Sequence, residues 1–387
     1  MTSTQEHALI VGASGITGYG LLQNLLSYPT ADYWTSITGL TSRPMDKAQA
    51  LLPDKVRLRL VSGLNLNTPH AEAVVAFLKA IPQIELITHV YFAAYSVKDC
   101  ENLQDIKRLN IRLLSNLIEA VDACCPNLQF ITLQTGGKYY GVQFPKDVSL
   151  SPPFKESFPR IPQPLANEIF YYAQIDLMIE RSKGKSWKWA DIRPDAIVGF
   201  VPQNNAMGIA QALAVFLSLY RYVHGDGAKV PFPGDLASFK AKHTDTSQDI
   251  LTRFTIFVSL KAENTNGHAY NIGCSDECTS WESKWSGICE YFGLEGVSPQ
   301  PDHTFSVSRW IEEHRAHCQR WVEEFQLREG AFEGTSWDFL EALVAESDFD
   351  RQYDLSAART LGFHETIDTV DSYHKAFDRY RQAKIIP

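Results

Sequence analysis

A glycine-rich turn near the start of the chain is the feature that most constrains its fold. The apolar run Ala8–Val11 predicts a short strand, and Gly12-Ala13-Ser14-Gly15-Ile16-Thr17-Gly18 follows it directly, ahead of an apolar stretch through Leu25 that predicts a helix. Glycines at such a turn let the backbone approach a pyrophosphate, whose charge is held by the free amides of the helix N-terminus. We predict a dinucleotide site, the alternative being a tight turn without a ligand. The predicted site residues are Gly12, Ser14, Gly15, Ile16, Thr17 and Gly18.

Residues 1–200 alternate β-rich and helical runs, the pattern of βαβ units on a parallel sheet. The predicted strands are Ala8–Val11, Ser36–Leu40, Val56–Val61, Leu86–Phe92, Leu128–Leu133 and Trp187–Ile192. Beyond Gly199, residues 207–224 and 245–260 predict helices, residues 269–272 predict a late strand, and the remainder is helical and rich in Trp. The expected fold is α/β, a Rossmann-type doubly wound parallel sheet with a smaller, mostly helical C-terminal substrate lobe. Residues 1–200 and 241–275 would form the nucleotide-binding domain, and residues 201–240 and 276–387 the lobe.

Composition excludes several classes of protein. The 387 residues include 45 acidic and 36 basic side chains, and the net charge of −9 repels nucleic-acid phosphates and anionic membrane surfaces. The apolar runs are shorter than the ~20 residues of a membrane helix and the N-terminus shows no signal peptide, so we expect a cytoplasmic protein. Seven cysteines, an odd count in a long chain, predict reduced thiols, and the absence of paired C-x-x-C spacing predicts no metal site. We expect a small-molecule substrate and no nucleic-acid partner, and a homodimer stays open.

The end of the second predicted strand indicates which dinucleotide the chain prefers. An Asp or Glu that would bind the free ribose 2′-hydroxyl of NAD is absent there. The sequence instead has Ser42 and Arg43, a hydroxyl and a guanidinium suited to a 2′-phosphate, so NADP(H) is favoured, with an ordinary surface arginine as the alternative. Asn65 follows the third strand, where a side chain can contact adenine, and Ala93 and Ala94 follow the fourth, where they leave room for the cofactor.

A catalytic tyrosine and lysine are harder to identify in the sequence than the cofactor residues. The glycine spacing resembles that of extended short-chain dehydrogenases, which normally carry Tyr-x-x-x-Lys on the helix between the fifth and sixth strands, because positions i and i+4 share a face. The literal match, Tyr380–Lys384, lies far beyond that helix, and the residue four after Tyr172 is Asp176, whose charge would raise the phenol pKa. Lys138, directly after the fifth strand, is the best cation, since at about 4 Å and an effective dielectric near 20 it would stabilise a phenolate by ~4 kcal/mol. The alternative is that Tyr172 and its neighbour Tyr171 are packing residues.

Several motifs resemble one known family. They are Thr135-Gly136-Gly137-Lys138-Tyr139-Tyr140-Gly141, Phe170-Tyr171-Tyr172 with Asp176, Ile192-Arg193-Pro194 followed by Ile197-Val198-Gly199-Phe200, and the ending Lys384-Ile385-Ile386-Pro387. Together they are similar to the progesterone 5β-reductase and iridoid synthase family of atypical extended short-chain dehydrogenases, over nearly the whole chain. The resemblance implies that Tyr172 and Lys138 form the catalytic pair and that Arg43 binds NADPH. It also implies that the cofactor is bordered by Thr135, Arg193, Pro194 and Ile197. Two departures are Tyr139, where the family commonly has His, and Ser42-Arg43 in place of a basic pair.

The implied reaction is hydride transfer from NADPH to an electron-poor carbon conjugated with a carbonyl, with Tyr172 and Lys138 holding the developing enolate oxygen. Reduction of the carbonyl carbon by a ketone reductase is the alternative, because the same residues would hold that oxygen. A catalytically silent NADP-sensing regulator and a sugar-nucleotide epimerase are alternatives of other classes. Aromatic residues predict a bulky apolar substrate, such as a terpenoid, steroid-like or polyketide compound. These residues are Tyr95, Tyr139, Phe154 and Trp337.

Overall fold

The computed structural model describes residues 5–203, 207–300, 305–330 and 332–387. Its centre is a seven-stranded sheet in the order β10-β6-β5-β4-β1-β2-β3, in which every neighbouring pair is parallel. The strands are β1 (Glu6–Val11), β2 (Trp34–Thr41), β3 (Leu58–Ser62), β4 (His89–Phe92), β5 (Phe130–Gln134), β6 (Lys188–Pro194) and β10 (His268–Ile272). The order reverses between β1 and β4, as in a doubly wound fold, so ligands are expected at the carboxyl edge of these strands. The predicted Rossmann-type sheet is confirmed, and the predicted late strand, β10, returns to it by pairing with β6.

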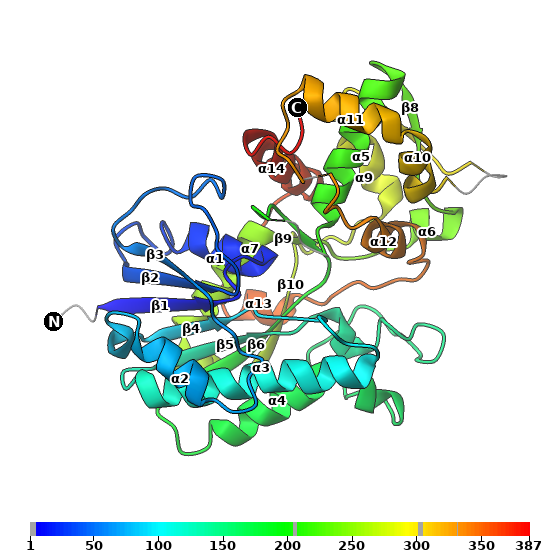
Figure 1. Ribbon diagram of the computed structural model, residues 1–387. Coiled ribbons are helices and arrows are strands. Elements are labelled where there is room, and N and C mark those ends of the chain that lie inside the picture. Colours follow the sequence, from blue (N-terminus) through cyan, green and yellow to red (C-terminus); the bar gives the residue numbers. More distant parts are fainter. Residues whose placement is uncertain (1–4, 204–206, 301–304, 331) are drawn as a thin grey trace.

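Helices cover both faces of the sheet (Figure 1). One face carries α2 (Glu72–Lys79), α3 (Leu103–Cys124) and α4 (Phe170–Arg181), which share a core cluster with the strands. The other carries α1 (Ile16–Asn24), α7 (Gln248–Ser259) and α8 (Ala262–Thr265). The sequence of α3 shows why it forms: Asn102 caps it by accepting a hydrogen bond from Asp105 N at 3.0 Å, and apolar side chains repeat along one buried stripe.

Predicted element boundaries differ from the structure at a few places. The strand predicted from Val56 begins at Leu58, because residues 56–57 form a turn in which Val56 is fully exposed. Leu86 belongs to a short 3₁₀ helix, η1 (Ile84–Leu86), that precedes β4. The helix predicted from residue 245 begins later, at Gln248. The residues before it form the short strand β9 (Thr246–Ser247), which pairs with β7 (Ile197–Val198).

The remaining elements form the helical lobe, which lies above and to the right of the sheet in Figure 1. They are α5 (Ile209–His224), β8 (Lys229–Pro231), α6 (Leu236–Lys240), α9 (Trp281–Glu290), β11 (Glu295–Val297), α10 (Val307–Glu313), α11 (Arg315–Glu324), α12 (Trp337–Leu340), η4 (Glu341–Ala345) and α14 (Thr369–Gln382). Part of the segment that the sequence assigned to this lobe returns to the sheet. There α13 (Ser356–Thr360) contacts β10, and Ala358 and Phe363 share a core cluster with Phe130.

Along the described ranges, no helix combines the length and the apolar composition needed to cross a membrane. The same ranges contain no group of three or more His, Cys, Asp or Glu side chains that could hold a metal ion. The seven cysteines form no disulfide bond in the structure.

Candidate active site

The glycine turn after β1 has the geometry of a phosphate cradle. Gly12 has a φ of +88°, and a Cβ there would lie 2.8 Å from Ala93 O and 2.9 Å from Ala94 Cα, so only glycine fits against the end of β4. Gly15 is the N-cap residue of α1 and provides no side chain to cap the first turn, and the Thr17 hydroxyl is buried without a partner among the described residues. Free amides and an unsatisfied hydroxyl at a helix N-terminus fit a pyrophosphate. The same turn contains the other predicted residues, Ser14, Ile16 and Gly18.

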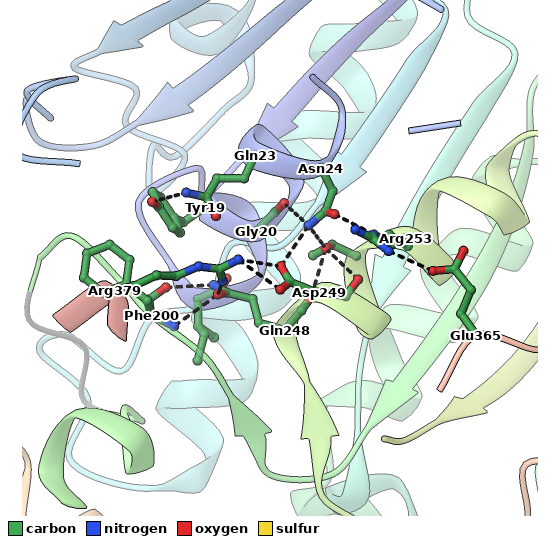
Figure 2. A network of polar contacts seen from close by, with 12 residues as sticks. Tyr19, Gly20, Gln23, Asn24, Phe200, Gln248, Asp249, Arg253, Glu365 and Arg379 are labelled. Atoms are coloured by element: carbon green, nitrogen blue, oxygen red, sulfur yellow. Dashed lines mark hydrogen bonds and ion pairs between the residues drawn. The ribbon is translucent and has the colours of Figure 1, made fainter. Parts of the chain in front are cut away.

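A polar network holds the first turn of α1 in place (Figure 2). Gln248, the first residue of α7, donates from Nε2 to Ile16 O at 2.5 Å and to Phe200 O at 2.8 Å. Arg379 of α14 donates to Gln248 Oε1 at 3.2 Å and forms an ion pair with Asp249 at 2.9 Å. Gln248 is only 1% exposed, so these bonds are made away from water. The cradle is therefore tied both to the segment after β7 and to the last helix of the chain.

The residues predicted to contact the adenosine half lie at the carboxyl ends of β2 and β3. Ser42 and Arg43 are exposed directly after β2, and the Thr41 hydroxyl donates to Arg43 O at 2.6 Å, which orders that loop. Asn65 is exposed after β3, and its Oδ1 accepts a hydrogen bond from Asn67 N at 3.0 Å. These side chains share the edge of the sheet that carries the glycine turn, and their contacts with a cofactor stay a prediction.

Lys138 lies in η2 (Gly137–Tyr140), within the loop that follows β5. Gly136 precedes this helix, and a Cβ there would lie 3.8 Å from the Tyr171 hydroxyl. Lys138 is half-buried, its ammonium makes no hydrogen bond or ion pair within the described residues, and Nζ lies 5.7 Å from the ring centroid of Tyr95. Burial lowers the pKa of Lys138, because no anion compensates for the lost hydration. An unpaired cation of this kind is suited to stabilise negative charge that develops on a ligand.

The two tyrosines at the start of α4 have different surroundings. Tyr172 is 4% exposed, and its hydroxyl donates to Tyr139 O at 2.7 Å and accepts from Ile161 N at 2.9 Å. Tyr171 is half-buried, and its hydroxyl makes no hydrogen bond to any described residue. Burial raises the pKa of Tyr171, so its phenol stays protonated at neutral pH. The sequence singled out Tyr172, but these contacts leave Tyr171 with the hydroxyl available to a ligand beside the Lys138 loop.

Arg193 and Thr135, predicted to border the cofactor, are engaged inside the protein. Arg193 forms an ion pair with Asp191 at 2.7 Å, and its guanidinium lies 3.4 Å from the ring centroid of Tyr139. Thr135 donates from Oγ1 to the other carboxylate oxygen of Asp191 at 2.5 Å. These contacts hold the start of the Lys138 loop on β6, and any further contact with a cofactor stays a prediction.

The predicted substrate-lining residues lie in three settings. Phe154 is 1% exposed and stacks on Tyr140 with ring centroids 4.8 Å apart, so its side chain supports the loop from the interior. Trp337 belongs to the lobe, where its ring packs against Phe332. Tyr95 is half-buried at the end of β4 and lies under the Lys138 ammonium. Tyr139 is buried, and its ring packs against Tyr172 with centroids 5.0 Å apart. Tyr95 and Tyr139 are thus the two residues of this set that the structure brings next to a predicted catalytic group.

Two residues that were not predicted from the sequence reach the site from the C-terminal part of the chain. The Tyr353 hydroxyl donates to Pro194 O at 3.3 Å, and Arg351 forms an ion pair with Asp195 at 2.9 Å. Pro194 ends β6 and the half-buried Ile197 begins β7. Tyr353 thus bonds one predicted cofactor residue, and Arg351 bonds Asp195 between the two. No motif signals them, because residues 351–353 are remote in sequence and lie outside any helix.

The chain is similar to known proteins over nearly its whole length. Residues 8–387 match the PRISE-like Rossmann-fold domain family. The chain is 36% identical to the short chain dehydrogenase ausT of Aspergillus calidoustus, covering 98% of this chain and 94% of that protein. It is 25% identical to the 3-oxo-Δ(4,5)-steroid 5-β-reductase of Arabidopsis thaliana, covering 100% and 94%.

Among solved structures, the UDP-glucuronic acid 4-epimerase from Bacillus cereus in complex with NAD has a TM-score of 0.60 at 16% identity, covering 97% of this chain and 99% of that one. This likeness shows the fold. The resemblance predicted from the motifs is confirmed by the family match and the relatives. The chain therefore belongs to the PRISE-like Rossmann-fold family and is an oxidoreductase of the short-chain dehydrogenase/reductase type, built to use a nicotinamide cofactor.

Proposed function

We propose that the protein is an NADPH-dependent reductase that adds hydride to an α,β-unsaturated carbonyl of a bulky apolar compound, such as a terpenoid, a steroid-like molecule or a polyketide. One observation carries this proposal. Two polar groups without protein partners, Lys138 Nζ and Tyr171 Oη, lie around Gly136 and Tyr95 at the carboxyl edge of the sheet that also carries the phosphate cradle. When bound, the nicotinamide supplies the hydride.

Tyr171 and Lys138 would hold the carbonyl oxygen of the substrate. As hydride adds to the β-carbon, the electron pair of the C=C bond moves toward the carbonyl and negative charge collects on its oxygen. Tyr171 donates a hydrogen bond and then its proton to this oxygen, and the Lys138 ammonium compensates the charge. Burial keeps the phenol protonated until then, and an oxyanion next to Lys138 favours the charged amine. We place Tyr171 in this role instead of Tyr172, whose hydroxyl is bonded to main-chain groups.

The preference for NADPH over NADH rests on the loop after β2. Arg43 is exposed there beside the Ser42 hydroxyl, and the loop lacks the carboxylate that would bind a free 2′-hydroxyl and repel a 2′-phosphate. A guanidinium can bind a phosphate through two parallel hydrogen bonds.

The preference for an apolar substrate rests on a row of three aromatic rings at the site, in which the half-buried Tyr95 and Tyr171 present a surface and Phe170 is buried between them. The rings of Tyr95 and Phe170 stack with centroids 5.6 Å apart, and Phe170 and Tyr171 follow at 4.3 Å. Such a surface binds flat, apolar molecules and places their polar end at the phenol. The Arabidopsis relative is named as a reductase of a 3-oxo-Δ(4,5)-steroid, which supports a conjugated ketone as substrate here.

The test is NADPH consumption with a panel of cyclic enones and their saturated ketone counterparts, using cofactor deuterated at the transferred position. Deuterium at the β-carbon of the product supports the proposal. Deuterium on the carbinol carbon would instead identify a ketone reductase, the second candidate, because Tyr171 and Lys138 can hold the same oxygen in both reactions. Tight NADPH binding without any turnover would favour a regulatory sensor. The cytoplasmic location and a homodimer stay predictions, to be checked by fractionation and light scattering.

A further inference from the structure

The segment Arg351–Asp354, called the strap below, connects the helical lobe to the sheet beside the site. It follows α12 and η4 of the lobe and precedes α13 on the sheet. Its main chain is bonded on both sides, since Arg351 N donates to Lys242 O at 2.8 Å and Phe154 N donates to Gln352 O at 2.7 Å. The strap therefore lies like a short strand between the segment at Lys242 and the segment at Phe154.

Tyr353 of the strap contacts two segments of the site, the end of β6 and the loop that contains Lys138. Its hydroxyl donates to Pro194 O at the end of β6, at 3.3 Å. A Cβ on Gly137 would lie 2.7 Å from the same hydroxyl, so the phenol leaves no room for even one methyl group there. Gly137 directly precedes Lys138, and the ring of Tyr353 also packs against Tyr140 at the end of the same short helix.

Arg351 supplies the second contact of the strap. It is 3% exposed, and its Nε donates to Asp195 Oδ2 at 2.9 Å. Asp195 N in turn donates to Thr246 Oγ1 at 3.1 Å, which holds the loop between β6 and β7. Removing Arg351 would leave a buried carboxylate without compensation and would destabilise the fold. Tyr353 is therefore the residue at which the strap can be probed while the protein stays folded.

We propose that the strap positions the loop that contains Lys138. Tyr353 sets the distance between the backbone at Gly137 and the end of β6 at Pro194, and thereby the position of Lys138. The proposal rests on the proposed role of Lys138. Tyr353 is 5% exposed and bonded to the main chain, so it acts through Lys138 and not on the reacting atoms. Because the strap continues into the lobe, the lobe and Lys138 are positioned together.

A double-substitution cycle between Gly137 and Tyr353 tests this role. Tyr353→Phe removes only the hydroxyl and should slow turnover about fivefold, the loss expected for one ordinary hydrogen bond. Gly137→Ala places a methyl group against that hydroxyl and should slow turnover roughly 30- to 100-fold by displacing the loop. In the double variant the phenyl ring leaves space for the methyl group, so turnover should recover about tenfold over Gly137→Ala, with the KM for NADPH unchanged. Tyr270→Phe, which removes a buried-strand hydroxyl that donates to Asn264 O at 3.5 Å, is the matched control and should leave turnover unchanged.

A second measurement reads the position of Lys138 without any substrate. Acylation of Lys138 by a small water-soluble reagent, followed across pH by peptide mass spectrometry, gives its apparent pKa. This pKa should move toward the ordinary lysine value in Gly137→Ala and return in the double variant. The positioning role would be overturned if turnover in the double variant fell by the product of the two single effects. It would also be overturned if Gly137→Ala did not change the labelling profile of Lys138. If the wild-type protein reduces no carbonyl compound while the labelling profile behaves as expected, the proposed function fails and the strap's role stands.

Discussion

Removing the hydroxyl of Tyr171 should stop most of the hydride transfer and leave the fold intact. That hydroxyl has no hydrogen-bond partner within the described residues, so Tyr171→Phe breaks no internal contact. The melting temperature should therefore stay within about 1 °C of the wild-type value. The loss of one donor to a developing oxyanion costs ~3–4 kcal/mol, so kcat should fall roughly 10²- to 10³-fold. The KM for NADPH should not change, because Tyr171 lies away from the phosphate cradle.

Tyr172→Phe should show the opposite profile. The substitution removes a hydroxyl that accepts from Ile161 N and donates to Tyr139 O, so two buried main-chain groups lose their partner. Each such group costs about 1–3 kcal/mol of the free energy of unfolding, and the melting temperature should fall by several degrees. Turnover should fall less than about tenfold, through a small displacement of Tyr139 next to Lys138.

The assay is stopped-flow oxidation of NADPH under saturating enone, in parallel with thermal unfolding of the two variants. Lys138→Ala serves as the reference for a lost charge in the same site. If Tyr172→Phe stopped hydride transfer while Tyr171→Phe retained it, the assignment of the free hydroxyl as proton donor would be refuted. A large loss of stability in Tyr171→Phe would also contradict the reasoning, because it would show that the hydroxyl has a structural partner.

Three further predictions concern the cofactor and the buried lysine. Arg43→Ala should raise the KM for NADPH roughly 10- to 100-fold, because it removes charge-assisted hydrogen bonds to the 2′-phosphate. The kinetics with NADH should stay unchanged, and an equal effect on both cofactors would exclude this contact. Thr17→Val should raise the KM for both cofactors about tenfold without lowering the melting temperature of the free protein, since its buried hydroxyl has no protein partner to lose. Burial lowers the pKa of Lys138, so the unfolded chain binds the proton of this amine more tightly than the folded chain does. The charged amine therefore lowers the free energy of unfolding at neutral pH. This penalty disappears as the pH rises from the lowered pKa through 10.5. Lys138→Met should therefore raise the melting temperature at neutral pH, and the difference should close toward pH 10.5; a difference independent of pH would argue against this origin.

The sheet and the cradle could be predicted because their signals are local, as in the apolar run Ala8–Val11 followed by glycines. The different hydrogen bonding of the Tyr171 and Tyr172 hydroxyls could not, since neighbouring residues on a helix point about 100° apart and the rotation of α4 is set by tertiary packing. Counting four residues from Tyr172 to Asp176 suggested an unfavourable charge beside the phenol. In the structure that carboxylate forms an ion pair with Arg160 at 2.6 Å, and the Arg160 guanidinium lies 5.0 Å from the Tyr172 ring centroid. The charge is thus compensated by a residue that no spacing rule connects to it.

Two contacts made by the C-terminal part of the chain support the site. Arg379 bonds Gln248, which holds the first turn of α1 and with it the phosphate cradle. Tyr353 bonds Pro194 and lies against Gly137, which precedes the proposed catalytic lysine. The division into a sheet domain and a helical lobe therefore describes where the chain packs, but residues from the far end of the sequence also contact the candidate site. The Tyr353–Pro194 contact is buried and the Arg379–Gln248 contact is partly buried, so we expect a movement of the lobe to shift the cradle or the Lys138 loop. Ligand binding in the lobe and alignment of the proposed catalytic groups should therefore be coupled.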